Sequence, residues 1–306
     1  MIRATVLLAT FDGARHLAAQ LDSLRAQEGV ELRMVAGDDG STDGTRSVLA
    51  AFAAQHGILA AQHEGPRRGA AANFLGLLAR TPPDGGLLAL CDQDDVWLPG
   101  KLARAGAMLS GLEGPALWVG RVSVCDEALA SCVPAPLPPR PPTFGGALVE
   151  ALGPGHAMVL NAPAWALLHE AARAGEAEGV PHHDWWASQM VLGAGGRVIL
   201  DDLPTTLYRQ HGGNALGSGH GLREALRAPR RMLRGQFARD ARAQRAALKR
   251  SAHRLTAEAR AALDALDALP RLSPLGRIRA LRGAGVRRGR PAAQAGLLLL
   301  AALGRL

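Results

Sequence analysis

The sequence is poor in cysteine, in aromatic residues and in long apolar runs, and each shortage narrows the class of protein. Its 306 residues include only three cysteines, an odd number without metal-type pairing. We therefore expect a reducing, cytoplasmic compartment rather than a secreted disulfide framework. The longest apolar run, Ala295 to Leu303, falls well short of the roughly 18 to 20 residues that span a bilayer. With no signal-peptide pattern at the N-terminus, we expect a soluble or peripheral protein.

The net charge of +8 is distributed unevenly along the chain. Residues 1–220 hold 15 basic and 22 acidic side chains, whereas residues 221–306 hold 20 basic and 5 acidic ones. An arginine-rich codon bias explains why only two residues are lysine, but it does not explain this asymmetry. The basic segment has two interpretations: helices that pack on the body or dimerise, or a surface that attracts an anionic membrane. Nucleic acid is disfavoured because the segment has almost no aromatic residues to stack on bases.

The first half of the chain alternates apolar runs with segments of helical period, which predicts an α/β fold with a mostly parallel sheet. We expect strands at 5–9, 32–36, 58–61 and 87–90, with helices between them, and a surface loop at 134–142, where six of nine residues are proline. Later strands are expected at 116–124, 157–160, 198–200 and 205–208, with helices at 164–174 and after 182. The glycines at 212–221 predict a boundary between a catalytic domain at 1–216 and a basic helical extension at 217–306, in which 237–269 has helical spacing.

An acidic cluster, Asp92-Gln93-Asp94-Asp95, follows the apolar run at 87–90 after Cys91. Ligands of open parallel sheets bind at the carboxyl ends of the strands. Three carboxylates in four residues repel one another unless a cation lies among them, and oxygen ligands select Mg²⁺ or Mn²⁺. The cluster therefore predicts a divalent metal site, with a solvated acidic turn as the alternative.

A second polar cluster runs from Asp38 to Thr45. It allows two compatible interpretations: a cap on the helix that follows, and a nucleotide pocket with Asp39 at its edge. A calcium loop starting at Asp39 is excluded, because its twelfth position is Ala50 instead of glutamate. A dinucleotide-binding dehydrogenase is excluded as well, because the first strand is not followed by Gly-x-Gly-x-x-Gly.

Seven short motifs follow one another in order within residues 3–216. They are Thr10-Phe11-Asp12-Gly13, Gln20-Leu21-Asp22-Ser23-Leu24, Asp38-Asp39-Gly40-Ser41-Thr42-Asp43, Asn73-Phe74, Cys91-Asp92-Gln93-Asp94-Asp95-Val96-Trp97, His183-Asp184-Trp185-Trp186 and Tyr208-Arg209-Gln210-His211. In this order the chain resembles family-2 glycosyltransferases, most closely the bacterial branch described as rhamnosyltransferase-like. The resemblance implies a GT-A fold, a nucleoside-diphosphate sugar donor, a divalent metal and inversion at the anomeric carbon.

The resemblance also implies roles for individual residues. Thr10, Asp12 and Asn73 would line the nucleotide pocket, and Asp39 would face the base. Asp92 and Asp94 match the family's Asp-x-Asp motif, the first near the ribose or metal and the second a metal ligand. Arg209 would close over the diphosphate, and His211 would be a further metal ligand. The family usually has asparagine at the position of Asp12, so we expect this carboxylate to face the base or the backbone and not the phosphates.

Asp184 matches the family's catalytic base, which would deprotonate an acceptor hydroxyl. Trp185 and Trp186 would offer apolar faces to sugar rings, with core packing as the alternative. Because adjacent helix positions do not share a face, at most one of them should be wholly core. His156 is expected either in the acceptor pocket or in a structural role. The acceptor would be a saccharide or a lipid-linked saccharide of cell-surface polysaccharide synthesis. The competing hypothesis is an inactive module that only binds a nucleotide sugar.

Overall fold

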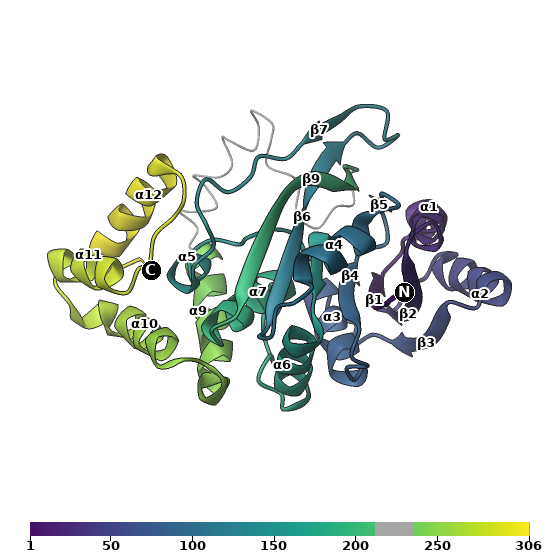
Figure 1. Ribbon diagram of the computed structural model, residues 1–306. Helices are drawn as coiled ribbons and strands as arrows, with labels where there is room; N and C mark the ends of the chain where they lie inside the picture. The colour runs from purple at the N-terminus through teal and green to yellow at the C-terminus, as the bar shows by residue number, and fades with distance from the viewer. Residues whose placement is uncertain (212–235, 306) are drawn as a thin grey trace.

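The computed structural model describes residues 1–211 and 236–305, which form a central sheet covered by helices on both faces (Figure 1). The strands are β1 (Ile2–Thr10), β2 (Val30–Asp38), β3 (Leu59–Glu64), β4 (Leu87–Cys91), β5 (Val96–Trp97), β6 (Ala116–Cys125), β7 (Cys132–Pro134), β8 (Met158–Leu160) and β9 (Arg197–Arg209). Over the described ranges they make one nine-stranded sheet of order β3-β2-β1-β4-β8-β6-β9-β5, with β7 paired to β6. The neighbouring strands β3, β2, β1 and β4 are parallel to one another, and β6 is parallel to β9. The predicted α/β fold with a mostly parallel sheet is therefore confirmed.

The helices cover the sheet in two layers, each with its own apolar core. They are α1 (Ala14–Arg25), α2 (Thr45–His56), α3 (Ala70–Arg80), α4 (Lys101–Leu109), α5 (Phe144–Ala147), α6 (Ala162–Arg173), α7 (His183–Gly193), α9 (Gln236–Arg250), α10 (Ala257–Ala268), α11 (Pro274–Gly283) and α12 (Pro291–Ala302), with 3₁₀ turns η1 (Gly155–Ala157), η2 (Ala252–Arg254) and η3 (Leu269–Arg271). Helices α1, α2 and α4 bury leucines such as Leu17, Leu49 and Leu102 against one face. The larger core joins α3, α6 and α7 to the other face. Burial of this apolar surface is the main term that stabilises the sheet.

Two expected elements differ in the structure. The residues predicted as two strands near 198 and 205 form the single strand β9, because β9 follows β6 across a register irregularity around Arg121 instead of ending. The helical pattern at 237–269 is broken into α9 and α10. The side chain of Thr256 accepts a hydrogen bond from the N–H of Ala259, and this cap begins a new helix within the leucine pattern.

A disulfide joins Cys125 to Cys132, whereas Cys91 is a buried free thiol. The two bridged residues lie directly opposite each other in the antiparallel pairing of β6 with β7. The odd cysteine count did not predict this bridge, because the pairing depends on the hairpin register and not on the number of cysteines.

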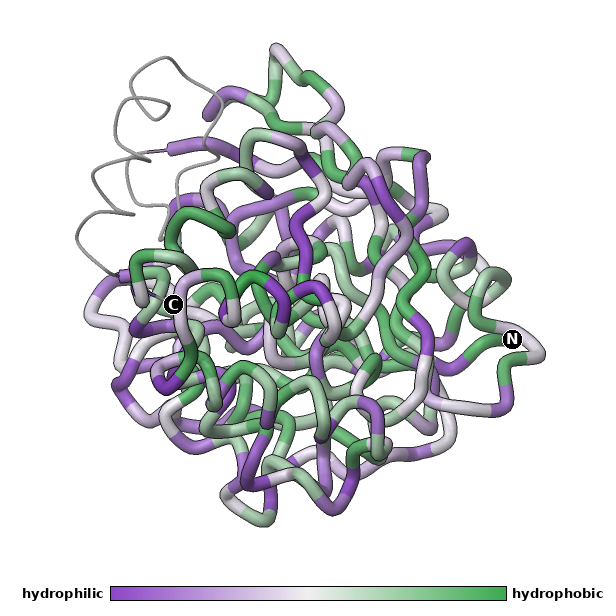
Figure 2. The backbone as a smooth tube through the Cα atoms, turned by 90° about the vertical axis from the view of Figure 1, so that its left-hand side faces the viewer, coloured by the Kyte–Doolittle hydropathy of each residue, from purple (hydrophilic) through white to green (hydrophobic). Residues whose placement is uncertain are grey.

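The C-terminal helices pack on the body of the protein, in agreement with one of the two interpretations of the basic segment (Figure 1). Leu248, Leu263 and Leu297 belong to the same apolar core as the sheet. Arg254 adds ion pairs to Glu170 and Glu176 of the body at 2.9 and 3.0 Å. Figure 2 views the molecule from the side of these helices. The predicted boundary at 216–217 lies outside the described residues, and no helix of the described part is long and apolar enough to cross a membrane.

Candidate functional site

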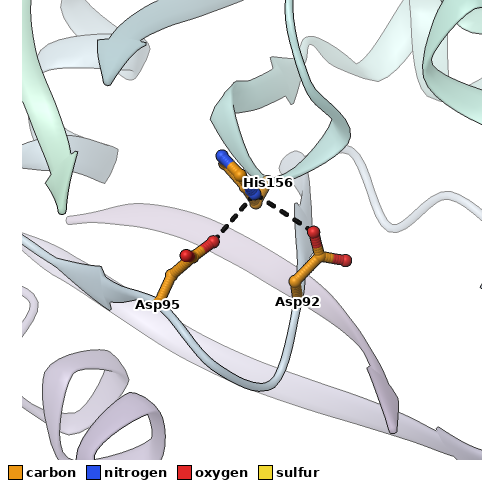
Figure 3. A group of neighbouring side chains, drawn as sticks. All are labelled: Asp92, Asp95 and His156. Atoms are coloured by element: carbon orange, nitrogen blue, oxygen red, sulfur yellow. Dashed lines mark hydrogen bonds and ion pairs between the residues drawn. The ribbon is translucent and has the colours of Figure 1, made fainter. Parts of the chain in front are cut away.

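The acidic cluster lies where β4 ends and is closed by a short 3₁₀ turn from a distant part of the sequence. Figure 3 shows the imidazole of His156, from η1, between the carboxylates of Asp92 and Asp95. Its Nδ1 atom is 3.1 Å from Oδ2 of Asp92 and 2.8 Å from Oδ2 of Asp95. The side chains of His156 and Asp95 are buried, whereas that of Asp92 is 39% exposed. The sequence predicted the carboxylates but not that a histidine would be inserted between them.

These contacts set the charge of the histidine. Burial alone would lower the pKa of His156, but the carboxylates of Asp95 and Asp92 outweigh it and raise that pKa to about 10. Burial would conversely raise the pKa of Asp92, and the contact with His156 lowers it below its usual value. His156 is therefore protonated at neutral pH and supplies a positive charge to a cluster that would otherwise be strongly anionic.

The strand pairing of β5 with β9 brings a second pair, Asp94 and His211, to the same place. Val96 lies opposite Leu207 in this pairing, so the Asp92–Asp95 turn lies against the end of β9. The Nε2 atom of His211 is 2.9 Å from Oδ2 of Asp94, and both side chains are partly exposed. Burial, with repulsion from Asp95 and Asp92, raises the pKa of Asp94. This carboxylate therefore lies in an environment that favours a cation.

Arg209 holds the acidic turn from the side of β9. Its backbone N–H donates to Oδ1 of Asp95 at 3.2 Å, and its Nε donates to the carbonyl of Asp94 at 3.0 Å. A second guanidinium N–H donates to the carbonyl of Glu127. In this structure Arg209 is buried and fixes the turn, while its expected contact with a diphosphate remains a prediction.

The residues predicted for the nucleotide pocket line the carboxyl ends of β1 and β2. The Thr10 hydroxyl contacts Oδ1 of Asp38 at 3.0 Å. Oδ1 of Asp12 accepts the backbone N–H of Thr42 at 2.7 Å, so this carboxylate faces the backbone, one of the two orientations expected for it. The two oxygens of Asp39 accept the N–H groups of Arg67 and Gly69 at 2.6 and 2.7 Å. The amide of Asn73 donates to the carbonyl of Gly37 at 2.8 Å.

Helix α7 carries the predicted base, and its surroundings correct one expectation. Asp184 is half-buried at the first turn, where its Oδ1 accepts the N–H of Trp185. Trp185 and Trp186 are only 5% and 0% exposed, so the expectation that at most one is core was wrong. Helix α7 contacts α3 and α6 as well as α5 and α9, so nearly its whole circumference is buried. Trp186 therefore lies in the core and not at a surface that an acceptor reaches.

Two further residues lie at the site: Lys101, which the sequence did not suggest, and His183, which was not expected to bind a metal. Lys101 is fully buried; its ammonium donates to the carbonyl of His156 and to the Thr206 hydroxyl, and it lies 3.5 Å from the ring centroid of Trp97. Burial lowers its pKa to about 7. His183 stacks on Phe74 with ring centroids 4.2 Å apart. Its Nε2 and that of His156 are buried with no hydrogen-bond partner in the described part of the chain.

The side chains present suit a divalent cation. Ligand atoms of Asp92, Asp95 and His156 lie within 4.8 Å of one another. Binding there would require His156 to lose its proton, whereas Asp94 and His211 offer a carboxylate and an imidazole that are partly exposed. A mixed set of carboxylate and imidazole ligands fits Mn²⁺ or Mg²⁺, and the repulsion that raises the pKa of Asp94 would be relieved by either ion.

Comparison with known proteins agrees with this geometry. Residues 5–127 match the family model described as Glycosyl transferase family 2. An uncharacterized glycosyltransferase from Nostoc sp. is 33% identical over 105 residues, which are 34% of this chain and 31% of the relative. The match thus spans about a third of the length of that curated relative.

Two solved structures of S. aureus TarS have a similar fold. A fragment of TarS without a named ligand covers 92% of this chain and 90% of its own, with a TM-score of 0.54 and 15% identity. The fragment in complex with UDP-GlcNAc covers 80% of this chain and 70% of its own, with a TM-score of 0.52 and 14% identity. The fold is thus a GT-A-like α/β fold, and residues 5–127 are similar to glycosyl transferase family 2.

Proposed function

We propose that this chain is an inverting, metal-dependent glycosyltransferase that moves a sugar from a nucleoside diphosphate to a saccharide or lipid-linked saccharide. One observation carries the proposal: the polar ends of β1 and β2, the Asp92–Asp95 turn and the His211 side chain meet at one edge of the sheet. That edge is where open parallel sheets bind nucleotides. Residues 1–216 would form the transferase unit, and 217–306 a basic helical extension.

The donor class is supported by the TarS structure that binds UDP-GlcNAc, since the two chains share the fold. The sugar and base are not fixed by this likeness. The motifs resemble the rhamnosyltransferase-like branch, so dTDP-rhamnose is tested first, together with UDP and GDP sugars. A polysaccharide or its lipid-linked precursor would be the acceptor, and the reaction would take place on the cytoplasmic side of the membrane.

Several residues would bind and orient the donor. Asp39 and Asp12 shape the loops around the base, and Thr10 and Asn73 hold the strand ends that form the pocket floor. Asp92, Asp94 and His211 would hold the divalent ion, which stabilises the negative charge that develops on the leaving diphosphate. Arg209 fixes the Asp94 backbone and so sets the position of these ligands.

Asp184 would accept the proton of the attacking hydroxyl. Attack from the face opposite the leaving diphosphate inverts the anomeric carbon, and no covalent enzyme intermediate is needed. Burial lowers the pKa of the neighbouring His183, and the carboxylates of Asp184 and Asp92 oppose that shift. Trp185 fixes the first turn of α7, since its Nε1 donates to the carbonyl of Ala147.

A thermal-shift panel tests the proposal. The full chain is heated with dTDP-rhamnose and with UDP and GDP sugars, each with and without Mn²⁺. A donor stabilises the folded state by mass action, by about 2.7 kcal/mol at a hundred times its Kd. We expect one nucleotide sugar to raise Tm more with Mn²⁺ than without it, and then to be consumed with an acceptor. If no nucleotide sugar shifts Tm, the proposal is wrong; tight binding with neither transfer nor hydrolysis would favour the binding module instead.

A further inference from the structure

The last helix exposes an apolar face that the protein core does not use. Helix α12 has no charged residue, and its buried side consists of Leu297 and Ala301. Leu299 and Leu303, on its outer side, are 60% and 58% exposed. Leu275, at the start of the neighbouring α11, is 67% exposed. Helices that are apolar on all sides are normally buried, so we expect the exposed side of α12 to bind another molecule.

The charge around this apolar face has a single sign. Residues 271–306 contain eight arginines and no acidic residue. Six of these arginines are exposed and form no ion pair within the described ranges; they are Arg271, Arg279, Arg282, Arg287, Arg290 and Arg305. Elsewhere in the extension Arg245 pairs with Asp267, and Arg254 pairs with Glu170 and Glu176. The unpaired cations and the exposed leucines thus belong to the same C-terminal segment, which consists of α11, α12 and the residues that flank them.

We propose that α11 and α12 dock on an anionic lipid surface, with Leu275, Leu299 and Leu303 in the headgroup region and the six exposed arginines against the lipid phosphates. An apolar face flanked by arginines is the pattern of a helix that lies in a membrane interface. A second copy of the same face is disfavoured, because two surfaces without a carboxylate would repel each other. Nucleic acid is disfavoured too, since 271–306 contains no aromatic side chain to stack on bases.

This surface is connected to the helix that carries Asp184. The Nε of Arg288 donates to the carbonyl of Val149, and the N–H of Gly289 donates to Glu150, each at 2.9 Å. These contacts fix the segment that follows α5, and the carbonyl of Ala147 in α5 accepts hydrogen bonds from Trp185 and from Gln189 of α7. A cavity of about 480 Å³ opens between the same segment and the proline loop, lined by Arg140 and Arg287 among others.

If the proposed function is correct, these contacts between the docking surface and α7 suggest why the protein would bind a membrane. A lipid-linked acceptor is confined to the membrane surface, and docking would hold α7 at a fixed place relative to that surface. The cavity beside Arg287 would then face the polar side of the lipid layer. The docking itself depends only on α11 and α12, so it can be tested without any donor or acceptor.

Sedimentation with vesicles tests the proposal on the full chain. The vesicles are phosphatidylcholine alone or phosphatidylcholine with about a third of phosphatidylglycerol. We expect binding to the anionic vesicles, weakened by salt, and little binding to the neutral ones. The double substitution Leu299→Glu and Leu303→Glu should lower the partition about tenfold or more, and Arg279→Gln with Arg282→Gln should weaken it in proportion to the lost charge.

Matched controls keep the result specific. Met108 is 41% exposed on α4, so Met108→Glu introduces the same charge on another helix and should leave vesicle binding unchanged. Arg33→Gln removes an exposed arginine from β2 and should have little effect. Circular dichroism and Tm show whether each variant is folded. Equal binding to neutral and anionic vesicles, or full binding by a folded leucine variant, would overturn the proposal.

Two further measurements separate this proposal from the proposed function. Self-association of the wild type that the leucine substitutions abolish, without vesicle binding, would show that a second copy covers the face and would also overturn it. The nucleotide-sugar thermal shift should be the same in the leucine variants as in the wild type. Vesicle binding without any nucleotide-sugar shift would therefore leave the docking intact and contradict only the transferase function.

Discussion

The Nδ1 atom of His156 lies 2.8 Å from Oδ2 of Asp95, and both side chains are shielded from solvent. Removing the charge on one partner of a buried ion pair leaves the other uncompensated. His156→Gln is therefore expected to lower the free energy of unfolding by about 3–5 kcal/mol, as measured by urea denaturation. His56→Gln, on the exposed end of α2, serves as the control and should change little. An unchanged midpoint for His156→Gln would show that the pair does not stabilise the fold.

Two buried groups of the site should have opposite effects on the pH dependence of stability. The pKa of His156 is raised to about 10, so the stability that its proton contributes is lost as pH rises from 6.5 through 10. The pKa of Lys101 is lowered to about 7, mainly by burial, so the native state has already released a proton that the unfolded chain holds up to about 10.4. Between these values the two effects oppose each other, and the wild-type stability should be nearly independent of pH.

Lys101→Met removes one of these two effects and should expose the other. The free energy of unfolding is then expected to fall between about pH 7 and 10, by at most about 1.4 kcal/mol per pH unit. Denaturation at several pH values measures this slope, which does not depend on the constant loss from the missing hydrogen bonds. Parallel curves for the wild type and the variant would contradict the assignment.

Substitution of Asp94 should raise the stability of the metal-free protein but lower its activity. Its pKa is raised by burial and by Asp95 and Asp92, so its ionised form is disfavoured in the metal-free protein. Asp94→Asn is expected to raise the metal-free stability by up to about 1 kcal/mol, seen as a higher Tm. The same change should abolish the Mn²⁺-dependent shift and lower turnover more than about a hundredfold. If Asp94→Asn retains the Mn²⁺-dependent shift in Tm, Asp94 is not the metal ligand, and Asp92, Asp95 and His156 become the candidate ligands instead.

The sequence predicts the sheet well because strand ends, helical period and glycine turns are local signals. The turn after β4 is found in this way, since Asp92–Asp95 directly follow a run of buried residues. The insertion of His156 between two carboxylates is not found, because it depends on antiparallel pairing of β8 with β4 across about seventy residues. Helix α7 is misjudged for a related reason: the pattern of one helix does not tell how many neighbours surround it.

The sequence carries a signal for the buried position of Lys101. In a chain with 35 basic residues, only Lys101 and Lys249 are lysine. A guanidinium keeps its proton in any protein environment, whereas a buried ammonium can become neutral. A buried position can therefore require lysine instead of arginine, and the contact of Lys101 with the His156 carbonyl is such a position. Lys249, in contrast, is partly exposed and pairs with Asp267.

Asp184 gives the sharpest test of the proposed mechanism. Asp184→Ala should lower the rate of transfer by about 10²–10⁴, the usual contribution of a general base, while the donor-induced thermal shift stays unchanged. An acceptor with a more acidic hydroxyl should lose less activity in the variant, because it depends less on proton removal. Asp22→Ala, in an exposed position of α1, is the matched control and should transfer normally. Full transfer by a folded Asp184→Ala protein would exclude Asp184 as the base and leave His183, whose Nε2 has no hydrogen-bond partner in the described part of the chain, as the next group to test.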